Sequence, residues 1–501
     1  MRTLIVWAAA ASLGVAAAAQ AQAPQDDRAV FAKIKAEGTE RSQLGAVFDT
    51  LTTDIGPRLT ASPAHKRAVE FMRARLASYG LANVHTEPFA FGRGWEMQKV
   101  VVELVEPRYL PLIAYADGWS ASTAGEILAA PVTTAGKSPE EIAAMADRLK
   151  GAIVMTEPIM TNFVRQDRPN PSDPGYKPDS AAYATSVGRR PETAGAESPR
   201  QRAQRASDAL KAAGAGVILK PSIGEHGTVF VTGRDGGPGA VPSVTMSAEQ
   251  YNMIMRLIDR KVPVKLRVNV QTKFYDDDNG NAYNVIAELP GSDPAVRDEV
   301  VMLGAHLDSW HTGVGATDNA DASSAIVEAI RILEAIDASP RRTIRIALWG
   351  GEEQGLLGSR AWVEQHLAGD ANRAVREKFD VYFNMDNGTG PVYGFYEQQN
   401  PGVGELFDGW LAPLKELGAR KNTRESIGST DHLSFTSVGV PGFNPIQDYE
   451  NYDVREHHTN MDTVERLQLK DVQEASIAMA WFAYKAANAE SKIARPPAAT
   501  R

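Results

Sequence analysis

The stretch that decides the fold runs Thr343-Ile-Arg-Ile-Ala-Leu-Trp349 and passes directly into Gly350-Gly-Glu-Glu353. Ile344, Ile346 and Leu348 alternate with other residues, as apolar side chains do along a β-strand that turns one face to a core. Two glycines then end the strand, and two acidic side chains follow them. The stretch therefore predicts a buried strand whose carboxyl end carries polar groups.

Two further apolar runs end in the same way. Residues 299–303 lead into His306, and residues 379–383 lead into Asp386. An amphipathic helix is expected at residues 321–337, because its apolar residues return at helical spacing. Strands separated by helices predict an α/β fold with an open, mostly parallel sheet and helices on both faces. Ligands of such sheets gather at the carboxyl ends of the strands, so we expect these polar residues to meet there.

The first 23 residues form a segment apart from the fold. Arg2 gives a positive start, an apolar run continues to Ala19, and small-residue cleavage sites end at Ala23. This pattern predicts a secretory signal peptide, because the run is too short to favour a membrane anchor. We therefore expect an exported protein of the periplasm or the extracellular space.

The composition narrows the possible partners and chemistry. The 62 Asp and Glu residues outnumber the 53 Lys and Arg residues, for a formal charge of −9. This balance argues against a nucleic-acid partner, which calls for clustered cations. The chain has no cysteine, which excludes disulfides, a thiol nucleophile and a cysteine zinc site. No apolar stretch of spanning length follows the leader, so no membrane anchor is expected.

The 501 residues are enough for more than one domain. A stretch rich in Pro, Arg and Ser interrupts the pattern of the main domain and is bracketed by short apolar strands. We interpret it as a smaller inserted α/β domain; the alternative is an irregular part of one large domain. The expected organisation is a signal peptide at 1–23, the N-terminal part of the main domain at 24–123, the insert at 124–247, the catalytic domain at 248–490 and a C-terminal tail at 491–501.

The polar residues near the strand ends form a set suited to metal ions. Singly, each signal is weak, because a His-x-Asp is usually a polar turn, a Glu-Glu pair a helix start and paired histidines a surface feature. Together, however, these residues are expected at one edge of a sheet, which favours a metal site over the ordinary role of each. Carboxylates and imidazoles are ligands that suit zinc. The candidate ligands are His306, Asp318, Glu353, Asp386 and His458.

The candidate ligands divide evenly over two ions. Two divalent cations about 4 Å apart need a bridging carboxylate, and Asp318 is the candidate. His306 with Asp386, and Glu353 with His458, would then give each ion one imidazole and one further carboxylate.

The neighbouring acidic residues have other expected roles. Asp308 could accept the second ring N–H of His306 and fix its tautomer, as carboxylates near metal sites do. Asp462 could do the same near His458. Adjacent side chains of an extended backbone diverge, so one residue of the pair Glu352-Glu353 should ligate while the other faces the water. Geometry alone leaves open which of the two does so.

These motifs occur in a consistent order over residues 283–464 and resemble metallopeptidase family 28, the co-catalytic zinc exopeptidases. The Leu-Asp-Ser-Trp that follows His306 is closer to the carboxypeptidase Q branch of that family than to its short aminopeptidases, and the insert resembles a protease-associated domain. The motifs that carry the resemblance are Asn284-Val-Ile-Ala-Glu-Leu-Pro290, Gly304-Ala-His306-Leu-Asp308-Ser-Trp310, Gly315-Ala-Thr-Asp318-Asn319, Trp349-Gly-Gly-Glu352-Glu353-Gln-Gly355-Leu-Leu-Gly358-Ser359, Asn384-Met-Asp386 and His458-Thr-Asn-Met-Asp462-Thr463.

The resemblance implies several properties of the site. Two zinc ions would be held by the five candidate ligands, which makes Glu353 a ligand and Glu352 the general base. A cis peptide is expected between Asp318 and Asn319, and a homodimer is a family-level expectation. Gly428-Ser-Thr-Asp-His432 resembles a motif beside the substrate pocket. The resemblance places His311, His432 and His457 near the site as non-ligating residues.

The predicted function is that of a secreted dinuclear zinc exopeptidase acting on terminal bonds of short peptides. Aminopeptidase, carboxypeptidase and dipeptidase activities all remain open. One alternative is an acyltransferase like the glutaminyl cyclases, with a single catalytic zinc. Another is a receptor-like binding protein that has lost its ligands. The complete ligand set and the Glu352-Glu353 pair argue against both alternatives.

Overall fold

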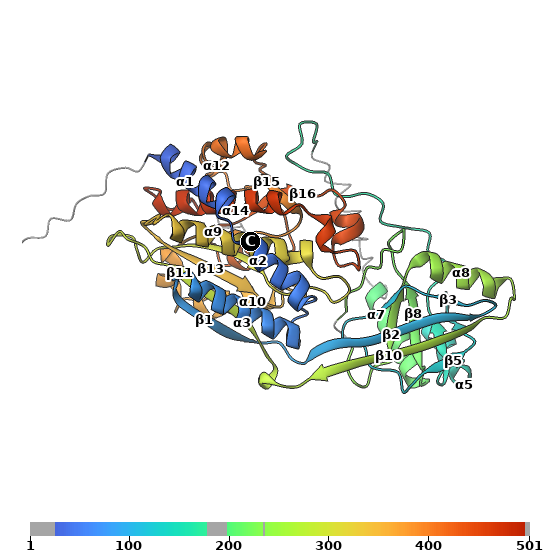
Figure 1. Ribbon diagram of the computed structural model, residues 1–501. Coiled ribbons are helices and arrows are strands. Elements are labelled where there is room, and N and C mark those ends of the chain that lie inside the picture. Colours follow the sequence, from blue (N-terminus) through green and yellow to red (C-terminus); the bar gives the residue numbers. More distant parts are fainter. Residues whose placement is uncertain (1–25, 178–197, 234–235, 496–501) are drawn as a thin grey trace, which may run out of the picture.

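The computed structural model describes residues 26–177, 198–233 and 236–495. The predicted signal peptide lies outside the described residues. Figure 1 shows two lobes: a large one with helices packed around the main sheet, and a smaller one at the end of two long strands. No helix among the described residues has both the length and the apolar character that a membrane crossing requires.

A seven-stranded sheet forms the centre of the large lobe. Its middle pairings, β13 with β12, β12 with β14 and β14 with β16, are parallel, and the pairings at both edges are antiparallel. The predicted parallel character therefore holds in the centre. In sheet order the strands are β1 (Ala82–Ala90), β11 (Asn281–Leu289), β13 (Thr343–Trp349), β12 (Val300–His306), β14 (Phe379–Asn384), β16 (Gly442–Asp448) and β15 (Thr389–Tyr396).

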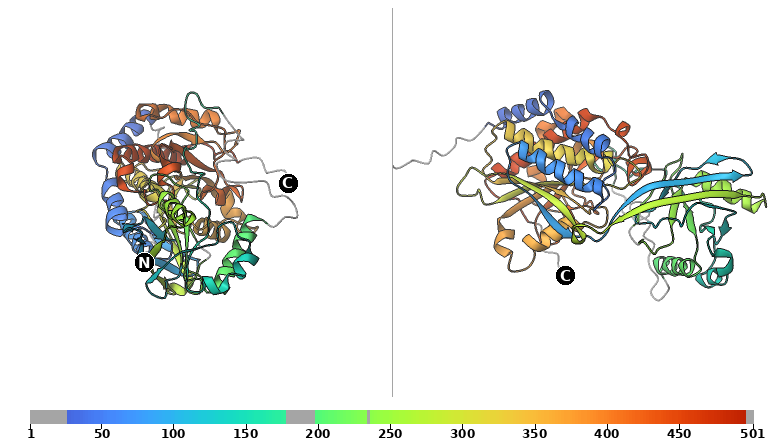
Figure 2. Two further views of the ribbon diagram at one scale, coloured as in Figure 1. Left: turned by 90° about the vertical axis from the view of Figure 1, so that its right-hand side faces the viewer. Right: turned by 60° about the horizontal axis from the view of Figure 1, so that its bottom comes forward.

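Helices cover both faces of this sheet, as the sequence predicts (Figure 2, right). Alternate residues of one strand serve the two faces, because successive side chains point to opposite sides. In β13, Ile344, Ile346 and Leu348 enter the larger apolar core, while Ala347 and Trp349 enter the smaller one. The helices that share the larger core are α1 (Asp27–Glu40), α2 (Leu44–Asp49), α3 (Pro63–Ser78), α9 (Asp321–Ala335), α12 (Gly404–Leu411) and α14 (Leu469–Asn488).

The opposite face is covered mainly by α10 (Leu357–His366) and α13 (His432–Thr436), through Trp362 and Phe435. Helix α11 (Arg373–Lys378) leads directly into β14. Short irregular helices complete this lobe: η1 (Thr50–Ile55), η2 (Asp278–Gly280), η3 (Ala316–Ala320), η4 (Ala412–Leu417), η5 (Tyr452–Glu456) and η6 (Val464–Arg466).

Strands β2 (Gly94–Glu106) and β10 (Lys265–Tyr275) pair along their whole lengths and carry the chain into the second lobe. There they join a four-stranded sheet with β3 (Leu110–Pro111) and β5 (Ile127–Ala129). A five-stranded sheet packs beside it, in the order β4 (Ala114–Ala116), β9 (Ser243–Met246), β8 (Val217–Pro221), β7 (Ile153–Met155) and β6 (Val132–Thr133).

The second lobe has its own apolar core, in which Trp95 of β2 and Tyr251 of a helix are fully buried. Its helices are α4 (Pro139–Ala143), α5 (Ala146–Leu149), α7 (Pro199–Ala212) and α8 (Ala248–Asp259). The described helices and strands of the range 124–247 belong to this lobe. Its assignment as a protease-associated domain stays a prediction.

Candidate metal centre

Three neighbouring strands end at the candidate site. His306 is the last residue of β12, and Asp386 lies two residues beyond the end of β14. Glu352 and Glu353 follow β13 after two glycines. Because β12 runs parallel to both β13 and β14, the three carboxyl ends share one edge of the sheet.

Two loops complete the group. Asp318 lies within η3, ahead of α9, and His458 follows η5. Ligand atoms of His306, Asp318 and Glu353 lie within 4.8 Å of one another, and so do those of Asp318, His457 and His458. The five predicted ligands therefore meet at one place, although they span more than 150 positions of the sequence.

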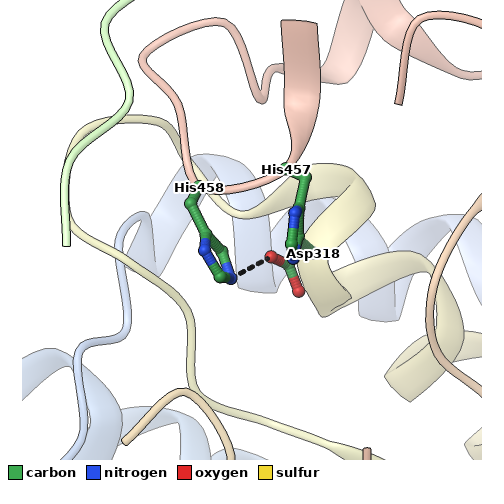
Figure 3. Close-up of side chains that lie close together, drawn as sticks. All are labelled: Asp318, His457 and His458. Carbon is green, nitrogen blue, oxygen red and sulfur yellow. Dashed lines mark ion pairs between the residues drawn. The ribbon is translucent and has the colours of Figure 1, made fainter. Parts of the chain in front are cut away.

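Asp318 lies between the two imidazoles. Its Oδ1 is 3.2 Å from Nε2 of His306, and its Oδ2 is 3.4 Å from Nε2 of His458. Figure 3 shows the second of these pairs as a dashed line. Each carboxylate oxygen thus faces a different ring nitrogen, which is the arrangement that a bridging ligand needs.

Each imidazole also faces one further carboxylate. Oδ1 of Asp386 is 3.5 Å from Nε2 of His306, and Oε2 of Glu353 is 2.8 Å from Nε2 of His458. The structure therefore pairs Asp386 with His306 and Glu353 with His458, as predicted for two ions that each have one imidazole and one further carboxylate.

The charges and unmet contacts of this group fit metal ions. Oδ2 of Asp318 and Oε1 of Glu353 are buried without a hydrogen-bond donor among the described residues. Burial alone would lower the pKa of His306, but the surrounding carboxylates, Asp386 foremost, raise it well above 6.5. The pKa of His458 is raised to about 9 by Glu353 and Asp318 against the same effect of burial. The site therefore stabilises positive charge, and its oxygen and nitrogen atoms suit zinc.

Glu352 turns away from its neighbour. Its ligand atoms group with those of His306 and Asp386, whereas Glu353 lies against His458. Burial is the main cause that raises the pKa of Glu352 well above 4.5; the charges of Asp386, Asp431 and Glu353 add to it, and His306 opposes it. The two glutamates thus diverge, as adjacent side chains are expected to do.

Asp308 differs in detail from the expectation. Nδ1 of His306 lies 3.0 Å from the backbone carbonyl oxygen of Asp308 and 3.6 Å from its carboxylate. The carboxylate is occupied elsewhere: it accepts hydrogen bonds from Thr60 Oγ1 at 2.7 Å and from the backbone N–H of Glu352 at 3.3 Å. The carbonyl therefore orients the ring, and the carboxylate holds the glutamate loop.

Asp462 fixes the loop that carries Asp318. Its Oδ1 accepts from the backbone N–H and the hydroxyl of Thr317, at 2.7 and 2.9 Å. The peptide between Asp318 and Asn319 is cis, as the family resemblance implies. The sequence predicts a role for Asp462 near His458. Its backbone N–H donates to the carbonyl of Thr459, adjacent to His458, but its carboxylate bonds to the residue before Asp318.

The resemblance places three other histidines near the centre as non-ligating residues. His432 is fully buried and its Nε2 lies 3.1 Å from the carbonyl of Ile427. Nε2 of His311 contacts the carbonyl of Ala116 at 2.7 Å, so both rings have backbone partners. The ring of His457 lies 3.7 Å from that of His458, and burial lowers its pKa well below 6.5, with the charge of His458 acting in the same direction. A neutral His457 therefore lines the metal group.

Sequence reasoning missed Arg58. Its guanidinium is fully buried and donates only to backbone carbonyls among its described hydrogen bonds. The acceptors include Leu307, beside His306, and Gly315, which precedes Asp318 by three residues. Burial lowers the pKa of Arg58 to about 10 despite the nearby carboxylates. A single Arg after Pro in a loop gives no periodic signal that could have identified this role.

The chain is similar in sequence to known peptidases. Residues 284–483 match the model of Peptidase family M28. Carboxypeptidase Q of Bos taurus is 25% identical over 461 residues, which cover 92% of this chain and 88% of that protein. The Rattus norvegicus protein of the same name is 27% identical and covers 93% and 89%.

Solved structures share the fold. A peptidase M28 precursor from Shewanella amazonensis superimposes with a TM-score of 0.70 at 24% identity, over 94% of this chain and 99% of that one. A zinc aminopeptidase from Bacillus subtilis gives a TM-score of 0.59 at 19% identity, over 90% and 96%.

Proposed function

We propose that this chain, a zinc metallopeptidase of the exopeptidase class whose residues 284–483 match Peptidase family M28, uses two zinc ions to hydrolyse terminal peptide bonds of short peptides. The observation that carries the proposal is the position of Asp318. Its two oxygens face two different imidazoles, His306 and His458, and each imidazole has one further carboxylate.

The residues that would hold the ions are His306 with Asp386, Glu353 with His458, and Asp318 between them. Zinc, when bound, would polarise the scissile carbonyl and acidify water. Glu352 is proposed as the general base, because it lies beside this group without facing His458. It would take the proton of the attacking water and return it to the leaving amine.

Asp308 supports the proposed role of Glu352 by binding the backbone of the glutamate pair. Its carboxylate accepts the backbone N–H of Glu352 and, at 3.4 Å, that of Glu353. One buried side chain therefore fixes the backbone from which both glutamates project. This keeps the proposed base and the proposed ligand at a constant separation, as catalysis by oriented groups requires.

The remaining parts of the proposal come from the sequence. We propose short peptides as substrates, export to the periplasm or the extracellular space, and a homodimer. No nucleic acid and no membrane anchor are part of the proposal. The relatives include carboxypeptidases and aminopeptidases, so the terminus that the site accepts is decided by experiment.

The first experiment combines metal analysis with a peptide panel on the purified mature protein. The panel holds a dipeptide, an N-acetylated dipeptide, a C-amidated dipeptide and a tripeptide. About two zinc ions per chain, as a two-metal site requires, together with chelator-sensitive cleavage, would support the proposal. The blocked terminus that abolishes turnover then names the exopeptidase type. One zinc or none, with no peptide cleaved, would favour the cyclase or the binding protein.

A further inference from the structure

The second lobe holds the loop that carries His458. This loop, residues 451–460, belongs to the large lobe but contacts two separate segments of the smaller one, which we call the arm (residues 165–170) and the rail (residues 225–231). Figure 3 shows how the loop presents His457 and His458 to Asp318. The arm and the rail contact both the backbone and the side chains of this presenting loop.

The arm grips the first half of the loop. The carboxylate of Asp167 accepts the backbone N–H groups of Asn451 and Val454, at 2.9 and 3.0 Å. Arg168 donates to the carboxylate of Asp453 from its backbone N–H at 2.7 Å and from Nε at 2.9 Å. The Arg168 and Asp453 side chains are only 15% and 20% exposed, so this ion pair is more protected from water than a surface pair.

Arg168 also reaches toward the metal group. Its guanidinium lies 5.7 Å from the ring centre of Tyr452, and that ring stacks on His457 at 5.3 Å. His457 in turn lies against His458. A continuous row of side chains therefore connects the arm with the proposed ligand.

The rail pairs with the second half of the loop. The backbone N–H of Val231 donates to the carbonyl oxygen of His458 itself, at 3.0 Å. Phe230 and Thr459 form an isolated antiparallel bridge. Nη1 of Arg455 donates to the carbonyl of Glu225 at 2.8 Å. His458 is thus fixed through its own main chain by a residue of the other lobe.

The loop needs such support because of its backbone. His458 has a φ of 63°, in the left-handed region that a residue with a Cβ rarely adopts without surrounding contacts. Asn451, at the start of the loop, has a φ of 65°. Both residues are contacted by the second lobe, Asn451 through Asp167 and His458 through Val231.

We propose that the second lobe is a positioning device for His458, with Arg168 as its central positioning residue. Through Asp453 and Tyr452, Arg168 holds the loop so that His458 stays against Glu353 and Asp318. The inference rests on the proposed metal role of His458. Because metal binding and lobe docking favour the same loop conformation, each strengthens the other by the same factor.

The direct test is a zinc titration of the apoprotein with a competing chelator. Arg168→Met should weaken one of the two zinc sites about tenfold or more, the usual scale for a residue that orients a ligand, and leave the other unchanged. Arg420→Met is the matched control: it removes an ion pair between Asp173, which follows the arm, and the large lobe, away from residues 451–460. The control should keep both zinc affinities.

A second measurement uses the unaltered protein and so does not depend on the folding of a variant. Zinc added to the apoprotein should slow hydrogen exchange in the rail and the arm as well as in the ligand loops. Protection confined to the large lobe would overturn the inference, and so would unchanged zinc affinities in Arg168→Met.

These outcomes separate the inference from the proposed function. The zinc count and peptide cleavage of the wild-type protein test the proposed function. The wild type could bind two zinc ions and be active while the Arg168→Met variant keeps unchanged zinc affinities. That result would contradict only the positioning role of Arg168. A wild type without a zinc ion at His458 would remove both.

Discussion

Nη2 of Arg58 donates a 2.8 Å hydrogen bond to the carbonyl oxygen of Gly315. Nε of the same guanidinium donates to the carbonyl of Leu307 at 3.0 Å. One acceptor lies in the loop that carries Asp318 and the other in the loop that directly follows His306, and neither is close to residue 58 in the sequence. One buried cation therefore sets the spacing of two proposed metal-binding loops.

Replacing Arg58 should destabilise the protein strongly. Arg58→Met removes the guanidinium that donates to five carbonyl groups, of which only those of Leu51 and Gly315 also accept from a backbone N–H group among the described residues. We expect a loss of at least about 3 kcal/mol in the free energy of unfolding, measured by urea denaturation. Arg73→Met, which removes an exposed ion pair with Glu70, should cost less than about 1 kcal/mol. Equal losses in the two variants would contradict the role of Arg58.

The two adjacent glutamates should behave differently when each is changed to glutamine. Glu352→Gln should keep its zinc and lose roughly 10²–10⁴-fold in kcat, the scale for a general base. Glu353→Gln should lose affinity for zinc, because its carboxylate is the one that faces His458. Metal analysis with steady-state kinetics distinguishes the two. Loss of zinc in the first variant and not in the second would mean that the roles are exchanged.

Asp308 should matter for rate more than for fold. Asp308→Ala frees the backbone N–H groups of Glu352 and Glu353, whose separation it fixes. We expect about a 10–100-fold fall in kcat/KM, as for other residues that orient a metal site. The His306 ring keeps its backbone acceptor, so the zinc content should stay near that of the wild type. A variant of full activity would remove Asp308 from this role.

Zinc should stabilise the fold measurably. In the apoprotein, several carboxylates lie close together around Asp318. Zinc that binds only the folded state shifts the unfolding equilibrium toward that state by mass action. At free zinc 100 times above the dissociation constant, each site should add about 2.7 kcal/mol. Thermal unfolding with zinc and with a chelator tests this. An unfolding temperature independent of zinc would contradict a structured metal site.

An acidic pH should weaken the contact between β1 and α10. Glu87 accepts from Nε2 of His366 at 2.8 Å and contacts Nε2 of His85 at 3.0 Å. Burial would raise the pKa of Glu87, but the two histidines lower it to about 2, against a usual value of 4.5. A lowered folded pKa means that the stabilisation is complete above about pH 5 and is lost as the pH falls toward 2.

The measurement compares the wild type with Glu87→Gln between pH 7 and pH 3. The difference in unfolding free energy should start near about 2 kcal/mol, allowing for solvent screening, and shrink below about pH 4.5. Glu364→Gln, at an exposed position of α10, is the control. A difference that stays constant down to the lowest pH would contradict the depressed pKa.

Much of the catalytic sheet was predictable because its signals are local. The alternation of Ile344 and Ile346, and the polar residues directly after the strands, depend on neighbouring positions alone. Those signals led to His306, Asp386 and the pair Glu352-Glu353, which the structure brings together, while the resemblance chose Glu353 as the ligand. Ligands of parallel sheets bind at the carboxyl ends of the strands, and this rule predicted that these residues meet at one edge.

The contacts that sequence reasoning missed are not local. Arg58 binds carbonyls about 250 positions away, and backbone acceptors leave no mark on a sequence. Arg168 lies in a stretch rich in Pro and Arg, where a charged residue is usually solvated, and its partner Asp453 is 285 positions distant. Pairings of this kind depend on how two lobes meet, which no periodicity encodes.

The ladder of β2 and β10 has a further consequence for how such a chain can be assembled. Gly94 pairs with Tyr275, and just before them Ala90 of β1 pairs with Asn281 of β11. The chain therefore leaves and re-enters the large lobe at neighbouring points, between the β1–β11 pair and the β2–β10 pair. A gene segment for residues 94–275 could be exchanged or removed as a cassette without breaking the main sheet. Such an exchange would remove the contacts by which the second lobe holds the His458 loop. A chain that lost the lobe would then also lose a complete zinc site, so the two features would be inherited together.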